Sequence, residues 1–585
     1  MNTMKRRSQH WFSGIGRDLF IHRSFLKKEG YGPQVFDGRP VIGICNSWSE
    51  LTTCNSHLRT VADAVKRGVW QAGGFPLEFP TISLGEPFVK PTTMLYRNLM
   101  AMDVEEMILA NPLDGVVLLG GCDKTVPAQL MGAASADLPA IVVTGGPMLK
   151  GNWRGRTLGS GSDAFKMWDE VRAGRLSEEE FEEMESCISR SAGHCMVMGT
   201  ASTMACMAEV LGMTLPGGAC IPAPDSRRLA LAEASGRRIV EMVASDLRPS
   251  QIMTLEAMRN AIRVLMAVGG STNGVVHMIA LGGRLGLPVD LGLFDELSRS
   301  TPCILNLRPS GEYLMEDFYH AGGLPVVMER ISHLLQTDCV TVSGKTIGQN
   351  LDGAENYDEK VILDCDKPLS AEGGVAVLRG NLAPGGAIIK PTAASAHLLV
   401  HEGPALVFHD RVDLFERIDA PDLPVGEDSV LVLRNAGPVG GPGMPEWGNI
   451  PIPKKLLAKG VKDMVRISDA RMSGTAYGTV VLHVCPESAI GGPLALVRDG
   501  DRIKLDAPGR RLDLLVSERE LDERKSTWEP PAPVYTRGYG RLFLDHVLQA
   551  DRGCDFDFLI GSAAGARDLA PFYAALGGVR QSRGD

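Results

Sequence analysis

The chain has 585 residues with 60 basic and 70 acidic side chains, which gives a formal net charge of −10. This charge argues against nucleic acid or an anionic membrane as the main partner and favours a small-molecule substrate. A chain of this length is too long for one hydrophobic core, so two or more domains are expected.

The basic N-terminus is not followed by an apolar run of signal-peptide length. No stretch reaches the roughly 18 uninterrupted apolar residues that cross a membrane. We therefore expect a cytoplasmic protein with no membrane partner. In such a reducing compartment, its 12 cysteines would be thiols, metal ligands or catalytic groups rather than a disulfide framework.

Strands and helices alternate in the first 150 residues. Amphipathic periodicity predicts helices within 49–74 and over about 93–109. Short apolar runs predict strands within 39–48, 76–86, 114–121 and 138–146. This alternation predicts a mostly parallel sheet with helices on both faces. The acidic run 176–186 indicates a solvated helix face, and the pattern stays helical from about 190 to 340.

The pattern changes near residue 340. Short strand-like runs separated by Gly, Pro, Asn and Asp follow at 341–351, 375–384, 385–390, 404–410, 428–437, 478–487, 495–506 and 510–520. They predict an all-β barrel or sandwich, and a helical segment follows at 539–550. We expect an α/β domain over 1–375 and a β-barrel domain with a helical tail over 376–585.

The segment Gly120-Gly121-Cys122-Asp123-Lys124-Thr125 directly follows the apolar run 114–119. It places a thiol, a carboxylate and an amine on one loop at the C-terminal end of a predicted strand. Open α/β sheets bind their ligands at this edge. The segment is therefore a candidate active site.

Three cysteines, Cys54, Cys122 and Cys195, lie in loops rich in small or polar residues. They are 68 and 73 residues apart, so the local CxxC spacing of zinc ribbons and ferredoxins is absent. Spacing alone does not separate them from the other nine cysteines. Three thiolates could nonetheless hold an iron–sulfur cluster and leave one iron open as a Lewis acid.

Isolated carboxylates in Gly/Pro-rich loops are candidate ligands of a hard cation, and Glu86, Asp123 and Glu446 have this setting. Ser473 lies in a turn within 466–478, where it could act as a nucleophile or a base. No GxSxG motif surrounds it, which argues against an ordinary serine hydrolase.

Seven motifs in this order resemble the dihydroxy-acid and sugar-acid dehydratase family over about residues 35–560. They are CNSWSE with TCN (45–55), GGCDKT (120–125), GHCMVMGTASTM (193–204), GGSTNGVVH (269–277), RGNLAPGGAIIK (379–390), GGPGMPEW (440–447) and SDARMSG (468–474). The resemblance implies an iron–sulfur enzyme whose cluster ligands are Cys54, Cys122 and Cys195. It also implies a magnesium ion surrounded by Glu86, Asp123, Lys124 and Glu446, with Lys124 carbamylated.

The implied reaction is loss of water from a 2,3-dihydroxy acid. Ser473 would be the base that removes the C2 proton, and the open iron would act as Lewis acid on the C3 hydroxyl. The product would be a 2-keto-3-deoxy acid. Thr475 would contact a substrate hydroxyl, although an ordinary turn threonine explains it equally well.

The opening motif and the stretch 537–559 resemble the pentonate branch, which dehydrates arabinonate and xylonate. That branch implies a [2Fe–2S] cluster, although three cysteines would also serve a [4Fe–4S] cluster, and it implies a homodimer or homotetramer. The tail 576–585 departs from the branch because it lacks a terminal histidine.

Two alternatives remain at this stage. One is a dihydroxy-acid dehydratase of branched-chain amino-acid synthesis, with the same chemistry and a more apolar substrate. The other is a non-catalytic iron–sulfur redox or sensor protein, which would give no role to Glu86, Glu446 or Ser473.

Overall fold

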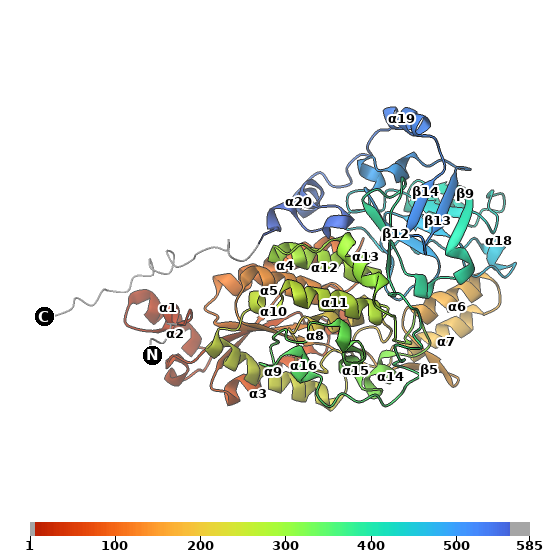
Figure 1. Cartoon of the computed structure of the whole chain (residues 1–585). Coiled ribbons are helices and arrows are strands. Elements are labelled where there is room, and N and C mark those ends of the chain that lie inside the picture. The colour runs from red at the N-terminus through yellow and green to blue at the C-terminus, as the bar shows by residue number, and fades with distance from the viewer. Residues whose placement is uncertain (1–5, 562–585) are drawn as a thin grey trace.

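The computed structural model describes residues 6–561 (Figure 1). Its N-terminal half is built on a four-stranded sheet in the order β2-β1-β3-β4, and every strand pair is parallel. The strands are β1 (Val41–Asn46), β2 (Phe75–Pro80), β3 (Gly115–Gly120) and β4 (Ala140–Thr144). β1, β3 and β4 are buried along their whole length, as expected for a parallel sheet that is covered on both faces. The predicted parallel α/β fold is confirmed.

Helices cover both faces of this sheet. α3 (Leu58–Gln71) and α9 (Ser226–Ser245) pack on one face, and α4 (Met94–Ala110) and α5 (Thr125–Ala136) pack on the other. α3 and α9 cross closely because glycine lies at their contact: a Cβ on Gly68 would stand 1.9 Å from the carbonyl oxygen of Glu233.

A further helical layer covers α5 (Figure 1). It contains α8 (Thr200–Val210), α11 (Leu255–Ala267) and α12 (Thr272–Leu285). The remaining α-helices before the barrel are α1 (Gln9–Phe12), α2 (Arg17–Lys27), α6 (Ser162–Arg172), α7 (Glu178–Ile188), α10 (Pro249–Ile252), α13 (Leu291–Arg299), α14 (Met315–His320), α15 (Gly323–Arg330) and α16 (Ile347–Asn350). The acidic run is helical as expected, since it forms α7. A two-stranded hairpin, β5 (Gly151–Trp153) with β6 (Arg156–Leu158), precedes α6.

The second half of the chain forms an eight-stranded sheet in the order β14-β13-β9-β10-β11-β12-β8-β7. Its strands are β7 (Ala376–Leu378), β8 (Gly386–Ile389), β9 (Val400–Phe408), β10 (Val430–Leu433), β11 (Arg466–Ser468), β12 (Val480–Cys485), β13 (Arg502–Asp506) and β14 (Arg511–Leu514). The two edge strands meet at Arg379, whose N–H donates to the Arg510 carbonyl at 3.0 Å and whose carbonyl accepts from Leu512 N–H at 3.0 Å. The sheet is therefore a nearly closed barrel, as predicted.

One detail of this half differs from expectation. The segment 341–351 was expected to be a strand, but it contains the short helix α16, because Thr346 and Gln349 form a capping box that starts a helical turn. The barrel is mixed, since β9, β10, β11 and β12 pair in parallel and the other strands pair antiparallel. Helices α17 (Arg411–Arg417) and α18 (Lys454–Leu457) lie on the connections between these parallel strands.

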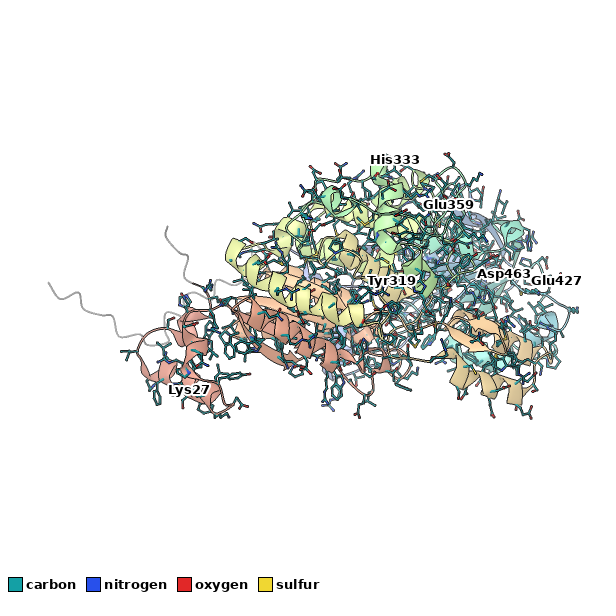
Figure 2. All side chains as sticks on the ribbon, turned by 90° about the horizontal axis from the view of Figure 1, so that it is seen from below. Lys27, Tyr319, His333, Glu359, Glu427 and Asp463 are labelled. Carbon is teal, nitrogen blue, oxygen red and sulfur yellow. The ribbon has the colours of Figure 1, made fainter. Side chains whose placement is uncertain are left out.

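Helices α19 (Glu518–Ser526) and α20 (Gly538–His546) follow the barrel. The N-terminal helices and the barrel lie at opposite ends of the molecule, as Lys27, Glu427 and Asp463 mark in Figure 2. No helix within residues 6–561 is long and apolar enough to cross a bilayer. The division at residue 375 stays a prediction, and the tail 576–585 lies outside the described residues.

Candidate active site

Three carboxylates from distant parts of the sequence converge between the two halves of the molecule. Glu86, Asp123 and Glu446 each place one oxygen within 4.8 Å of the others. Glu86 follows β2 and Asp123 follows β3, at the carboxyl edge of the parallel sheet, whereas Glu446 lies on the loop between β10 and β11. Carboxylate oxygens at this spacing are the donors that magnesium prefers. We call these three residues the carboxylate cluster.

Lys124 lies at the centre of the carboxylate cluster, and its side chain is fully buried. Its ammonium lies 3.3 Å from Glu86 Oε2 and 3.4 Å from Glu446 Oε1, and it donates a short hydrogen bond to Asp123 Oδ2. Burial and the charge of Arg471 oppose protonation, but the three carboxylates outweigh them and raise the pKa of Lys124. The three carboxylates thus already stabilise one buried positive charge, the Lys124 ammonium. Their negative charge and their oxygen donors therefore also fit a magnesium ion.

Hydrogen bonds and neighbouring charges stabilise the ionised form of Glu86. Its Oε1 accepts a 2.8 Å hydrogen bond from Thr92 Oγ1, and its Oε2 accepts from the backbone N–H of Thr93 at 3.2 Å. Burial alone would raise its pKa, but the charges of Lys124 and Arg471 and the threonine hydrogen bonds lower it to about 2. Glu86 is therefore an anion at any pH at which the protein would work.

Ser473 lies on a tight turn after β11, which we call the Ser473 turn (residues 471–476). Its Oγ lies 2.8 Å from Thr475 Oγ1 and accepts from the backbone N–H of Thr475 at 3.3 Å. The turn packs directly on the start of α12, since a Cβ on Gly474 would stand 2.6 Å from Ser271 Oγ. The Ser473 hydroxyl is consequently fixed in position.

Two buried side chains connect the Ser473 turn to the carboxylate cluster. Asn273 Nδ2 lies 3.2 Å from the carbonyl of Met472 and 3.1 Å from Glu446 Oε1. Arg471 donates from Nη1 to Glu446 Oε1 at 3.1 Å and from Nη2 to Thr92 Oγ1 at 3.0 Å. The sequence analysis did not identify Asn273 or Arg471 as site residues, although both lie inside the motifs 269–277 and 468–474. The signal that could have identified them is a polar side chain among small and apolar neighbours.

The three predicted cluster cysteines also come together. A hydrogen bond with Cys54, then burial, raises the pKa of Cys122. Burial first, then the neighbouring Cys54, raises the pKa of Cys195 to about 12. All twelve cysteines are free thiols, and each lies within residues 6–561. Because iron binds the thiolate, metal binding at these high-pKa thiols would release protons, and three convergent free thiols fit an iron–sulfur cluster with one open iron.

The thiols and the carboxylates form one continuous site. Cys122 Sγ donates to Asp123 Oδ1 at 3.6 Å, and Asp123 and Glu446 are among the charges that raise the pKa of Cys195. A cysteine outside the set has a different neighbour: Cys206 bonds to Cys220. Cys54, Cys122 and Cys195 thus lie beside the carboxylate cluster, and their role as cluster ligands stays a prediction.

The chain is similar along most of its length to known dehydratases. The sequence matches the dihydroxy-acid/6-phosphogluconate dehydratase N-terminal domain over residues 39–350 and the corresponding C-terminal domain over residues 360–554. The chain is 55% identical to the L-arabinonate dehydratase of Rhizobium leguminosarum bv. trifolii over 564 residues, which cover 96% of this chain and 97% of that one.

Two further relatives have different substrates in their names. The 6-deoxy-6-sulfo-D-gluconate dehydratase of Pseudomonas putida is 50% identical over 556 residues, covering 94% of this chain and 96% of its own. The dihydroxy-acid dehydratase of Carboxydothermus hydrogenoformans is 42% identical over 543 residues, covering 92% and 97%. The chain therefore belongs to the dihydroxy-acid/6-phosphogluconate dehydratase family and is a hydro-lyase.

Proposed function

We propose that this enzyme dehydrates a C5 or C6 aldonic acid, such as L-arabinonate or D-xylonate, to the 2-keto-3-deoxy acid. The observation that carries the proposal is the connection of Ser473 to the carboxylate cluster through Asn273, beside three convergent thiols. The choice of a sugar acid is supported by the names of the relatives, since the L-arabinonate dehydratase is 55% identical and the dihydroxy-acid dehydratase 42%.

In this proposal Ser473 Oγ takes the C2 proton of the substrate. The hydroxyl of Thr475, 2.8 Å away, can donate to that oxygen and stabilise its deprotonated form. Thr475 would also contact a substrate hydroxyl. Arg471 is fully buried and adds a fixed positive charge at the start of the Ser473 turn, which favours an anion at Ser473.

Two metal groups would supply the positive charge that acidifies the C2 proton and assists departure of the C3 hydroxyl. Magnesium would be held by Glu86, Asp123, carbamylated Lys124 and Glu446. A [2Fe–2S] cluster would be held by Cys54, Cys122 and Cys195. A [4Fe–4S] cluster with an open iron would serve the same role. Carbamylation turns the Lys124 side chain from a cation into an anionic oxygen donor, which suits its central position in the cluster.

We also propose that the enzyme is a homodimer or homotetramer. The N-terminal segment that includes α2 exposes large apolar side chains: Ile15 is 92% exposed, Phe20 68% and Phe25 61%. Exposed apolar side chains gathered on one short segment are typical of a surface that another subunit covers.

The test is an anaerobic assay of keto-acid formation with magnesium present. The substrates are L-arabinonate, D-xylonate, D-gluconate and 2,3-dihydroxyisovalerate. We expect turnover of at least one aldonate with kcat/KM well above that for dihydroxyisovalerate. The reverse order would assign the branched-chain reaction instead. Failure of every substrate with an intact cluster would favour the redox or sensor alternative.

A further inference from the structure

The carboxylate cluster draws on both halves of the molecule, so its spacing depends on how the two halves are held together. Glu86 and Asp123 follow strands of the parallel sheet, whereas Glu446 lies on the loop between β10 and β11. We call residues 435–447 the Glu446 loop. These residues form neither a helix nor a strand, so the buried backbone groups of the loop must find partners elsewhere.

A buried carboxylate outside the carboxylate cluster, Glu487, holds the first part of the Glu446 loop. Both of its oxygens accept from the backbone N–H of Val439 at 3.0 Å, and Oε2 also accepts from that of Gly440 at 2.9 Å. The approach is close, since a Cβ on Gly437 would stand 2.6 Å from Glu487 Oε2. The position of the loop therefore depends on the position of the Glu487 side chain.

Gln549 in turn fixes Glu487. Its Nε2 donates to Glu487 Oε1 at 2.7 Å, and its Oε1 accepts from the backbone N–H of Glu487 at 3.0 Å. Gln549 directly precedes the short 3₁₀ helix η8 (Ala550–Arg552), which packs against both α12 and β12. We call residues 549–555 the C-terminal clasp. Gln549 is thus the link from this clasp to the barrel.

The other end of the clasp is bonded to the N-terminal half. Arg97 Nη2 and Asn98 Nδ2 both donate to the carbonyl of Cys554 at 2.9 Å. These two residues lie on α4, and the N-cap residue of the same helix, Thr93, donates from its backbone N–H to Glu86 at 3.2 Å. The helix that orients Glu86 therefore also holds the clasp.

Two further contacts complete the connection. Asp555 forms a buried ion pair with Arg284 of α12, with 2.6 Å between Oδ2 and Nε. The Cys554 thiol lies 3.8 Å from the sulfur of Met444, which is two residues before Glu446. The clasp therefore joins α4 and α12 to the Glu446 loop.

We propose that the C-terminal clasp positions Glu446 against Glu86 and Asp123, with Gln549 as the positioning residue at its barrel end. A divalent cation is bound only while all three carboxylates are in place. If the loop adopts the competent position for part of the time, the apparent affinity falls by that fraction. The inference rests on the proposed function, because the cation concerned is the proposed magnesium ion.

The test measures magnesium binding by calorimetric titration of the cluster-loaded enzyme after bound magnesium has been removed with EDTA. Gln549→Leu removes both hydrogen bonds to Glu487, so the Kd for magnesium should rise at least fivefold. At saturating magnesium its kcat should return to within twofold of the wild type, because the ion then selects the competent loop position.

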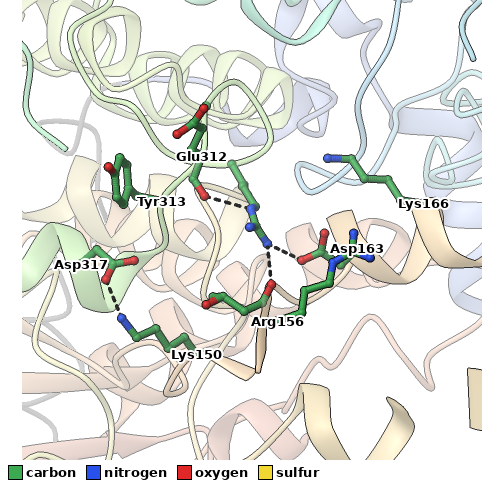
Figure 3. A pocket seen from close by; sticks show the side chains of 10 residues that line it. Lys150, Arg156, Asp163, Lys166, Glu312, Tyr313 and Asp317 are labelled. Carbon is green, nitrogen blue, oxygen red and sulfur yellow. Dashed lines mark hydrogen bonds and ion pairs between the residues drawn. The ribbon is translucent and has the colours of Figure 1, made fainter. Parts of the chain in front are cut away.

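The matched control is Lys150→Leu. It also removes a 2.7 Å hydrogen bond to a carboxylate, that of Asp317, in the wall of a cavity of about 600 Å³ (Figure 3). Because this cavity is lined by neither the clasp nor the Glu446 loop, the Kd for magnesium should stay within twofold of the wild type.

Asn98→Ala tests the opposite end of the clasp and should also raise the Kd for magnesium. The double variant with Gln549→Leu should bind magnesium about as weakly as the weaker single variant, because either change alone releases the clasp. A Kd in Gln549→Leu equal to that of the wild type would overturn the positioning role while the proposed function stands. A wild type that binds no magnesium would overturn the proposed magnesium site together with the role of the clasp.

Discussion

Replacing Asn273 with alanine removes the side chain that connects the Ser473 turn to the carboxylate cluster. Its Nδ2 lies within 3.2 Å of Thr200 Oγ1, Glu446 Oε1 and the Met472 carbonyl. Two hydrogens are available, so about two of these bonds exist at a time. One bond to a carboxylate is worth about 1.5–3 kcal/mol and one to a neutral acceptor about 1 kcal/mol. If about half of that total acts in the transition state, kcat falls about 8- to 30-fold.

The assay measures kcat of the iron- and magnesium-loaded variant beside a matched control, Asn260→Ala. Asn260 is equally buried, and its amide group exchanges two hydrogen bonds with the backbone of Gln336, at 2.9 and 2.8 Å. Both variants should lose similar stability, but only Asn273→Ala should lose activity. If Asn273→Ala keeps kcat within twofold of the wild type, the positioning role is wrong. An equal loss of kcat in Asn260→Ala would show that the loss of activity comes from general destabilisation and not from the position of Asn273.

Three further outcomes are expected. Cys54→Ser should abolish the visible absorption of the cluster, whereas Cys303→Ser, at a buried thiol beside Lys390, should keep it; iron analysis checks both. Magnesium at 100 times its Kd should raise the free energy of unfolding by about 2.7 kcal/mol, and denaturant titration with and without EDTA should find this difference reduced in Glu86→Gln. Burial, then the charge of Asp469, raises the pKa of Glu487 from its usual 4.5 to about 7. Because the pKa of Glu487 is higher in the folded than in the unfolded protein, the wild type loses stability as pH rises from about 4.5 to 7. Over that range the free energy of unfolding of Glu487→Gln should rise by about 3 kcal/mol relative to that of the wild type. Denaturant unfolding at pH 5 and pH 8 measures this gain, and a pH-independent difference would contradict it.

Much of the N-terminal fold follows from local pattern. β3 is a run of buried Val and Leu residues bounded by glycines, and it lies where the sequence predicts a strand. The helix at 347–350 was missed because its signal is a capping box, which apolar alternation does not reveal. The sequence makes no prediction of the parallel order of β9 to β12, since strand direction is decided by long-range pairing and the intervening helices are short.

Part of the site could likewise be predicted from the sequence. Loop residues such as Asp123 and Glu446 are carboxylates within Gly/Pro-rich motifs, so they could be selected as candidate ligands. Their convergence depends on the packing of the barrel against the sheet, which no local pattern records. Asn273 and Arg471 act through other residues, and a buried amide or guanidinium has no sequence signature apart from its partners.

The central claim is that Ser473 is the base that starts the dehydration. The most direct test compares wild type and Ser473→Ala, both purified anaerobically and matched in iron, sulfide and magnesium content, with the best aldonate of the panel. The account predicts that the wild type forms the 2-keto-3-deoxy acid and that the variant forms at most a trace while it still binds the substrate. Turnover by Ser473→Ala at a rate near that of the wild type would contradict the account.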